Sequence, residues 1–258
     1  STQVSRVVID SRQAVPDSVF VALRGEQTDG HRYVGDALAR GAGCAIVERY
    51  QGEEATVVDL RGTSAGVPPL PERIVAPLCL VVPDSLVALQ QVAAWWRSLF
   101  DIRVIGITGS IGKTTTKEYV GSVLAQHYNV LKSEGNYNNE IGLPLTLLRL
   151  DHSHECAVLE MGTYGLGEIT LLTQLARPHV GLVTNVGPVH LERMGTIERI
   201  VDAKAELPEA LPPGGVAILN GDDERGGARS ERRVWVNVGE FQQETHARHK
   251  VGLRTQQE

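Results

Sequence analysis

Segments with a strand-like pattern alternate with segments that have a helix-like pattern along most of this sequence, and this alternation restricts the fold more than any other feature. Short runs rich in β-branched residues predict strands at 6–10, 18–23, 44–48, 56–60, 103–107, 128–132, 156–161, 179–185 and 215–220. Amphipathic runs predict helices from about 33 to 41 and at 113–126, 167–176 and 196–210. Such alternation is typical of an α/β protein with a largely parallel sheet flanked by helices.

The alternation also indicates where domains begin and end. Leu86, Leu89, Val92 and Trp96 follow helical spacing, so a helix is predicted over 85–100. We interpret it as the connector between a first domain, residues 1–84, and a second domain, residues 85–223. After residue 223 the alternation stops. Residues 224–258 are dominated by Arg, Glu, Gln, Gly and His, with one strand-like run at 234–238.

Composition argues against several classes of protein. The formal net charge of -6 argues against a protein that binds nucleic acid through an overall basic surface. The longest apolar run, 74–82, contains a proline and is too short to span a bilayer. A basic segment followed by an apolar stretch, as in a signal peptide, is missing at the start. We therefore expect a cytoplasmic protein with no membrane span and no nucleic-acid partner.

A glycine-rich loop between a strand and a helix is the strongest local signal. In residues 104–116, Gly109 and Gly112 leave backbone N–H groups accessible, and the following helix directs its positive end toward the loop. Lys113 can reach terminal phosphates, and the hydroxyl of Thr114 can bind magnesium. The strict pattern requires glycine at 107, where isoleucine stands, so this is a variant phosphate loop. A glycine-rich turn without a ligand is the alternative.

Further polar groups lie near the carboxyl ends of predicted strands, where open α/β sheets bind ligands. Glu160 ends one strand, His190 follows another, and Lys204 lies within a helix. A carboxylate in that position suits magnesium, whereas an ammonium group cannot bind a metal. Solvated surface groups are the alternative for all three residues. The loop 133–140 carries asparagines suited to contact a peptide or sugar, with an ordinary turn as the alternative: Asn136, Asn138 and Asn139.

Together, these motifs resemble the Mur ligase family in their order as well as their residues. In the second domain the resemblance involves 106–118, 135–148, 160–162, 167–169, 184–190, 203–206 and 219–223. In the first domain it involves 10–12, 19–25 and 29–31. The resemblance implies a small uridine-nucleotide-binding α/β domain followed by a mostly parallel, P-loop-type sheet domain.

The family's chemistry gives these residues an expected function. The resemblance implies an ATP-dependent ligase of peptidoglycan precursor synthesis that converts a peptide carboxylate to an acyl phosphate, which an amine then attacks. The stretch 138–144 favours the member that adds D-Ala-D-Ala to UDP-N-acetylmuramoyl-tripeptide. A sister ligase that adds another amino acid is the alternative, and we expect a monomer.

The resemblance also assigns roles to individual residues. Thr114 and Glu160 would bind a first magnesium ion and His190 a second, while Lys204 would be a carbamylated metal ligand. The catalytic residues would be Lys113, Lys204 and His190. ATP would contact Gly109, Ser110, Ile111, Gly112, Lys113, Thr114, Thr115 and Asn220. The UDP-linked peptide would contact Ser11, Arg12, Asp29, Gly30, His31, Asn136, Asn138 and Asn139.

The sequence departs from the family's pattern in two respects. Ile111 stands where many members have asparagine, in a loop position that faces phosphate. The family's third domain, which closes over ATP and binds the incoming amino component, has no counterpart after residue 223. We therefore expect a truncated ligase with an incomplete central domain. The alternatives are a non-catalytic protein that binds the UDP-linked peptide or ATP, and an unrelated P-loop ATPase or kinase.

Overall fold

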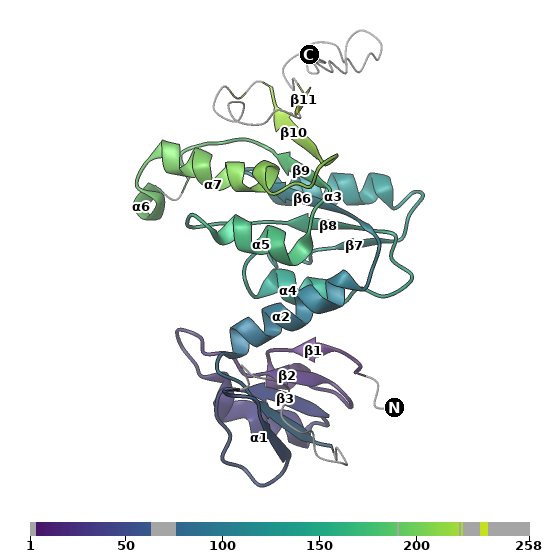
Figure 1. Ribbon diagram of the computed structural model, residues 1–258, viewed down its shortest axis with the longest axis vertical. Coiled ribbons are helices and arrows are strands. Elements are labelled where there is room, and N and C mark those ends of the chain that lie inside the picture. The colour runs from purple at the N-terminus through teal and green to yellow at the C-terminus, as the bar shows by residue number, and fades with distance from the viewer. Residues whose placement is uncertain (1–3, 63–75, 190, 222, 224–232, 237–258) are drawn as a thin grey trace. The chain divides into compact units, whose positions relative to one another are not determined.

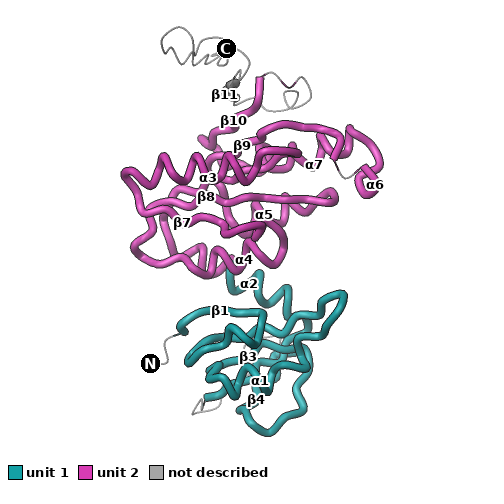
Figure 2. Tube along the Cα trace, turned by 180° about the vertical axis from the view of Figure 1, so that it is seen from behind, with its two compact units in different colours: residues 1–93 teal, residues 94–258 magenta. Residues whose placement is uncertain are grey.

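The computed structural model describes residues 4–62, 76–189, 191–221, 223 and 233–236 of the chain. The backbone forms two compact units, residues 1–93 and 94–258 (Figure 2). The division falls inside helix α2 (Ser85–Ser98), the helix that the sequence analysis interprets as the connector. Among the described residues, no helix combines the length and apolar character needed to cross a bilayer.

Unit 1 is built on a five-stranded sheet with the order β1-β2-β3-β5-β4, of which Figure 1 labels β1, β2 and β3. All of its strand pairs are parallel. The strands are β1 (Val7–Val8), β2 (Val19–Val21), β3 (Cys44–Val47), β4 (Thr56–Asp59) and β5 (Leu78–Val81). Short helices connect them: η1 (Ser11–Gln13), η2 (Gly30–Tyr33) and α1 (Val34–Ala39).

The core of unit 1 lies between the sheet and α1. Phe20 on β2 is almost fully buried, and Val34 and Ala37 of α1 pack in the same cluster of buried residues. Because Val34 and Ala37 are three residues apart, they lie on one face of the helix. This apolar face holds α1 against the sheet and leaves the carboxyl ends of the strands for polar groups.

Unit 2 contains a six-stranded sheet with the order β11-β10-β9-β6-β8-β7 (Figure 1). Every strand pair in it is parallel. The strands are β6 (Arg103–Thr108), β7 (Val130–Lys132), β8 (Cys156–Glu160), β9 (Val180–Val183), β10 (Val216–Asn220) and β11 (Arg233–Val236). The helices are α3 (Lys113–Leu124), α4 (Gly142–Leu147), α5 (Glu168–Ala176), α6 (Leu191–Met194) and α7 (Ile197–Glu209). The predicted α/β fold class is confirmed.

Two short helices of unit 2, α4 and α6, lie where no helix is predicted from the sequence. The residues of α4 explain why that helix is not predicted. Its sequence contains Gly142 and Pro144, which disfavour helix interiors, and it lacks a polar face. Both residues lie in the first turn, where proline is tolerated because its N–H would have no helical partner. Leu143 and Leu147 are fully buried, so packing rather than propensity stabilises this helix.

Candidate nucleotide and metal site

Three neighbouring strands bring the candidate residues of unit 2 together. The sheet order β9-β6-β8 places β6 in the middle, with the glycine-rich loop following it. Glu160 ends β8 on one side, and Thr184 and Asn185 follow β9 on the other. After β6 the chain first adds strands on one side of it and later adds β9 on the other side. Open α/β sheets bind ligands at the carboxyl end of the strand where the order reverses in this way.

The loop needs glycine at two positions. Gly109 has a φ of +140°, and a Cβ atom there would lie 2.0 Å from Oγ1 of Thr184. Gly112 has a φ of +86° and immediately precedes α3. Residues with a side chain rarely adopt these conformations, so both glycines are required by the backbone path.

Residues that follow β9 hold the loop in place. The backbone N–H of Ser110 donates to the carbonyl of Asn185 (3.0 Å), and the N–H of Ile111 donates to its Oδ1 (3.0 Å). Oγ1 of Thr184 donates to the carbonyl of Ile111 (2.7 Å). Two loop N–H groups are thus engaged within the protein. The first-turn N–H groups of α3 lack helical partners and can donate to an anion.

Lys113 lies over the loop that precedes it. Its Nζ donates to the carbonyls of Gly109 (2.9 Å) and Ser110 (3.3 Å). Burial lowers the pKa of Lys113 below its usual value, while the charge of Glu160 acts in the opposite direction. Thr115 lies in the same first helical turn. This end of α3 therefore combines a lysine cation with a helix N-terminus, an arrangement that favours phosphate.

The carboxylate of Glu160 has a hydrogen-bond donor on each oxygen. Oγ1 of Thr114 donates to Oε2 (2.8 Å), and Nδ2 of Asn138 donates to Oε1 (2.8 Å). Glu160 is only 2% exposed. Hydroxyl and carboxylate oxygens are ligands that Mg²⁺ accepts, usually with water and phosphate oxygens completing its coordination. Groups of three or more His, Cys, Asp or Glu that could hold a metal are absent from the described part of the chain.

The three asparagines of the loop 133–140 occupy different environments. The side chain of Asn138 contacts Glu160, and the backbone carbonyl of Asn138 accepts from the N–H of Gly162 (2.8 Å). Oδ1 of Asn139 accepts from the N–H of Gly142 (2.9 Å) at the start of α4. Asn136 is exposed. The structure therefore connects Asn138 to the candidate metal site, whereas it gives Asn139 a role in helix capping.

Lys204 is buried in α7, although the sequence alone favours a solvated lysine. Burial, and after it the charge of Lys113, lowers its pKa to about 8. Glu206, which the sequence analysis does not single out, fixes α7 against the start of α5. Its carboxylate accepts from the N–H groups of Gly167 (2.6 Å) and Thr170 (2.8 Å). Asn220 ends β10, and His190 lies outside the described residues.

Asp29 and His31 in unit 1 form a closely bonded pair. Asp29 accepts from the backbone N–H of His31 (3.0 Å) and from its Nδ1 (2.6 Å), and these bonds lower the pKa of Asp29 to about 2. Nε2 of His31 accepts from the N–H of Glu48 (2.9 Å), which assigns the neutral Nδ1–H tautomer. The imidazole of His31, which is 5% exposed, therefore links η2 to the residue that follows β3.

Gly30, between these two residues, has no room for a side chain. A Cβ atom there would lie 2.8 Å from the carbonyl oxygen of Leu23 and 2.9 Å from its nitrogen. Ser11, another candidate, is buried in η1. Its hydrogen bond to Asp36 is the main cause that lowers the pKa of that carboxyl group.

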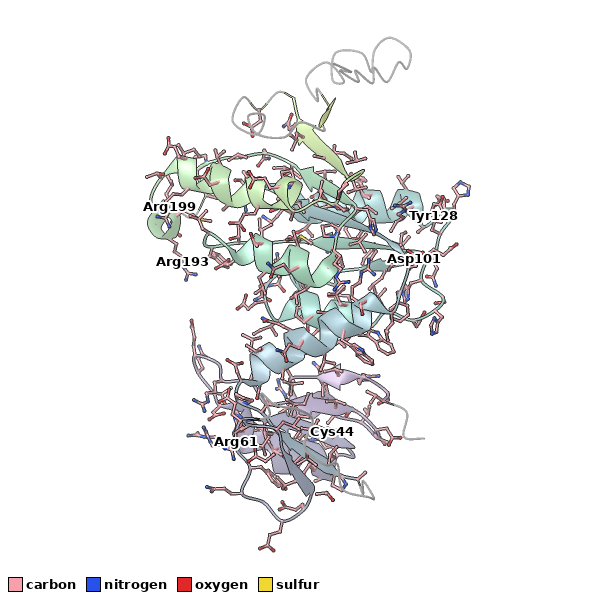
Figure 3. All side chains as sticks on the ribbon, viewed as in Figure 1. Cys44, Arg61, Asp101, Tyr128, Arg193 and Arg199 are labelled. Carbon is pink, nitrogen blue, oxygen red and sulfur yellow. The ribbon has the colours of Figure 1, made fainter. Side chains whose placement is uncertain are left out.

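Four arginines lie just after strands at the carboxyl edge of this sheet, and each forms an ion pair with a carboxylate. The pairs are Arg12–Asp10, Arg24–Glu48, Arg49–Asp29 and Arg61–Asp59. Each arginine side chain is more than half exposed; Figure 3 labels Arg61. Of the four, only Arg12 is among the residues expected from the sequence to contact the UDP-linked peptide. The signal for the others is their position directly after a strand.

The strand, glycine-rich loop and helix, with a lysine over the loop and a Thr–Glu pair beside it, define a P-loop-type α/β protein. Comparison with known families gives a more specific result. The model "Mur ligase middle domain" matches residues 107–257, and "Mur ligase family, catalytic domain" matches residues 3–92. The chain belongs to the Mur ligase family, which confirms the resemblance seen in the sequence.

Relatives that add D-alanyl-D-alanine are among the most similar proteins found. The UDP-N-acetylmuramoyl-tripeptide–D-alanyl-D-alanine ligase of Synechocystis sp. is 42% identical over 222 residues, which are 86% of this chain and 44% of the relative. The Escherichia coli ligase of the same name is 38% identical over 84% of this chain and 43% of its own length. The chain thus spans less than half the length of these relatives.

Solved structures similar to this chain include members of the same family. MurF from Acinetobacter baumannii superposes with a TM-score of 0.78 at 35% identity, covering 93% of this chain and 49% of that one. MurF ligase from Thermotoga maritima, in complex with ADP, gives 0.73 at 33% identity, covering 90% of this chain and 50% of that one. Because each match covers at least 90% of this chain, it includes residues of both units.

Proposed function

We propose that this chain binds ATP as its magnesium complex at the carboxyl edge of the sheet in unit 2. The observation that carries the proposal is the hydrogen bond from Thr114 to Glu160, beside Lys113 and the start of α3. Lys113 and the first-turn N–H groups would bind the phosphates. The Thermotoga maritima relative was solved in complex with ADP, which supports nucleotide binding by this chain.

Thr114 and Glu160 are the residues proposed to hold magnesium. The bound ion would offset negative charge on the phosphoryl oxygens, which is the main requirement of phosphoryl transfer. A second ion at His190, as the resemblance implies, stays a prediction because His190 lies outside the described residues.

Lys204 is proposed to carry a carbamate. Formation of a carbamate requires a neutral amine, whose nitrogen attacks CO₂ and loses a proton as the N–C bond forms. With a pKa of about 8, roughly a tenth of Lys204 is neutral at pH 7, a much larger share than for a lysine with the usual pKa. The product is anionic and would offer oxygen in place of an ammonium group near Lys113.

Unit 1 is proposed to bind the uridine diphosphate part of UDP-N-acetylmuramoyl-tripeptide. The exposed arginines at the carboxyl edge of its sheet offer guanidinium groups, which suit phosphate oxygens. The Asp29–His31 pair and Gly30 would fix the backbone beside them. Asn136, Asn138 and Asn139 are retained as candidates for contact with the peptide part.

We infer that the complete reaction is ligation of D-Ala-D-Ala to the tripeptide through an acyl phosphate. The peptide carboxylate would attack the γ-phosphorus and release ADP, and the amine of D-Ala-D-Ala would then displace phosphate. The relatives named above support this substrate pair. Because the chain spans less than half of their length, the activity of this chain by itself is a separate question.

Calorimetry with Mg·ADP tests the nucleotide site. The Lys113→Ala variant should bind about 10- to 100-fold more weakly, because a hydrogen bond to a charged group contributes about 1.5–3 kcal/mol. Lys132→Ala, a change of the same type at a partly exposed lysine that pairs with Glu118, is the control and should bind as the parent does. Unchanged affinity in Lys113→Ala would contradict the assignment.

A phosphate-release assay separates a ligase from a binding protein. ATP is supplied with UDP-N-acetylmuramoyl-tripeptide, with D-Ala-D-Ala, or with both. We expect this chain to bind Mg·ADP and to form little product. Phosphate release that needs both substrates, at rates ordinary for an enzyme, would instead establish ligation by these residues alone.

A further inference from the structure

Lys117 is a buried cation to which neither the sequence motifs nor the proposed reaction gives a role. It lies on α3, four residues after Lys113, and its side chain is 0% exposed. Lysine is rarely buried unless it is paired, because moving an ammonium group out of water is costly. Its surroundings should therefore explain why it is there.

One of the contacts of Lys117 is with the carboxylate of the candidate metal site. Its Nζ lies 3.9 Å from Oε2 of Glu160 and 3.3 Å from Oε1 of Glu118, and it donates to the carbonyl of Gly135 (3.2 Å). Glu160 is itself only 2% exposed. Lys117 thus places a positive charge beside the carboxylate that is proposed to hold magnesium.

We propose that Lys117 is a resident counter-ion of Glu160, which makes the site bind a divalent cation poorly by itself and well together with nucleotide phosphates. This inference rests on the proposed function and adds to it a preference for the complex of cation and nucleotide over the free cation. Before ligand arrives, the buried carboxylate is compensated by Lys117 and by the nearby charge of Lys113. A bare cation would meet the carboxylate of Glu160 with the ammonium groups of Lys117 and Lys113 beside it, while Glu118 pairs with Lys117 and Lys132 at a half-exposed position. A cation that arrives with phosphates brings enough negative charge to satisfy them.

Mn²⁺ binding to the full 258-residue chain tests the proposal, because free Mn²⁺ can be counted by its electron paramagnetic resonance signal. Lys117→Met removes the charge and keeps most of the side-chain volume. In the absence of nucleotide, this variant should bind Mn²⁺ at least about tenfold more tightly than the parent, since a repelling charge has been removed. In the presence of ADP, the two proteins should differ much less.

Two control variants locate the effect. Lys132→Met changes the net charge equally but removes a lysine that is 35% exposed and pairs with Glu118, so its Mn²⁺ affinity should match the parent. The double variant Lys117→Met/Glu160→Gln should lose the gain, because Glu160 is the carboxylate that the cation meets. Lys117→Gln keeps a donor for the carbonyl of Gly135 and should also bind Mn²⁺ more tightly than the parent. This variant tests the proposal if Lys117→Met does not fold.

The outcomes separate this proposal from the proposed function. Equal or weaker binding of free Mn²⁺ in a folded Lys117 variant that still binds ADP would overturn the counter-ion role alone. A similar gain in Lys132→Met, or a gain that persists without Glu160, would overturn it as well. Failure of the parent chain to bind Mg·ADP would instead overturn the proposed nucleotide site.

Discussion

Replacement of Gly30 by alanine should destabilise unit 1, whereas the same replacement five residues later should not. A Cβ atom at position 30 would lie 2.8 Å from the carbonyl oxygen of Leu23, 2.9 Å from its nitrogen and 3.2 Å from Cα of Ala22. Carbon atoms pack favourably at about 3.5–4.0 Å. The obstructing atoms belong to the backbone, so they cannot turn aside as a side chain would.

The expected cost is about 1–3 kcal/mol, the usual penalty for adding a methyl group where no space exists. Gly35, in α1, has no atom within 4 Å of the corresponding position. Gly35→Ala should be neutral or stabilise by up to about 1 kcal/mol, because alanine favours a helix more than glycine does.

Thermal unfolding of the two variants is the assay. For a unit of this size, each kcal/mol corresponds to a shift in Tm of roughly 4–8 °C. Gly30→Ala should therefore lower the Tm of the transition assigned to unit 1 and weaken binding of UDP, while Gly35→Ala should lower neither. Equal melting temperatures, or equal shifts in both variants, would refute the steric argument.

Three further predictions concern charged groups. Hydrogen bonds from His31 hold the pKa of Asp29 at about 2 rather than 3.8, so the contribution of Asp29 to the free energy of unfolding is present above pH 3.8 and is lost as the pH falls toward 2. Asp29→Asn should therefore make stability less dependent on pH in this range. An unchanged slope of stability against pH would argue against the pairing. Glu206→Ala should lower the Tm, since the N–H groups at the start of α5 lose an acceptor at a cost of about 0.5–2 kcal/mol; Glu209→Ala, at an exposed position of the same helix, is its control. With ¹³C-bicarbonate the parent chain should show a carbamate carbon resonance that Lys204→Ala lacks, and an identical spectrum in both would leave Lys204 without that modification.

Local patterns in the sequence were sufficient to predict much of the fold. The strand, glycine-rich loop and helix around Lys113 are adjacent in sequence, so periodicity and glycine spacing predict them. The same is true of the alternation that gives both parallel sheets. Helix α4 was missed because its residues have poor helix propensity and form a helix through burial. A single sequence carries little information about such tertiary stabilisation.

The candidate site was harder to predict because its contacts join distant residues. The Thr114–Glu160 pair was expected only as two separate metal ligands, and the link from Asn138 to Glu160 was not expected. Lysine on a helix is exposed by default, so helical periodicity does not distinguish Lys117 or Lys204 from solvated residues, and only the family motif at 203–206 points to Lys204. Their burial follows from how α3 and α7 pack on the sheet, which depends on the whole of unit 2.

The bonds from Thr184 and Asn185 to the glycine-rich loop have a kinetic consequence. A loop that must become ordered when its ligand arrives loses conformational entropy, which weakens binding and often adds a slow step. Here the backbone around Ser110 and Ile111 is already fixed by the segment that follows β9. Nucleotide should therefore associate in a single phase whose observed rate rises linearly with concentration, without the plateau that a slow loop rearrangement would impose.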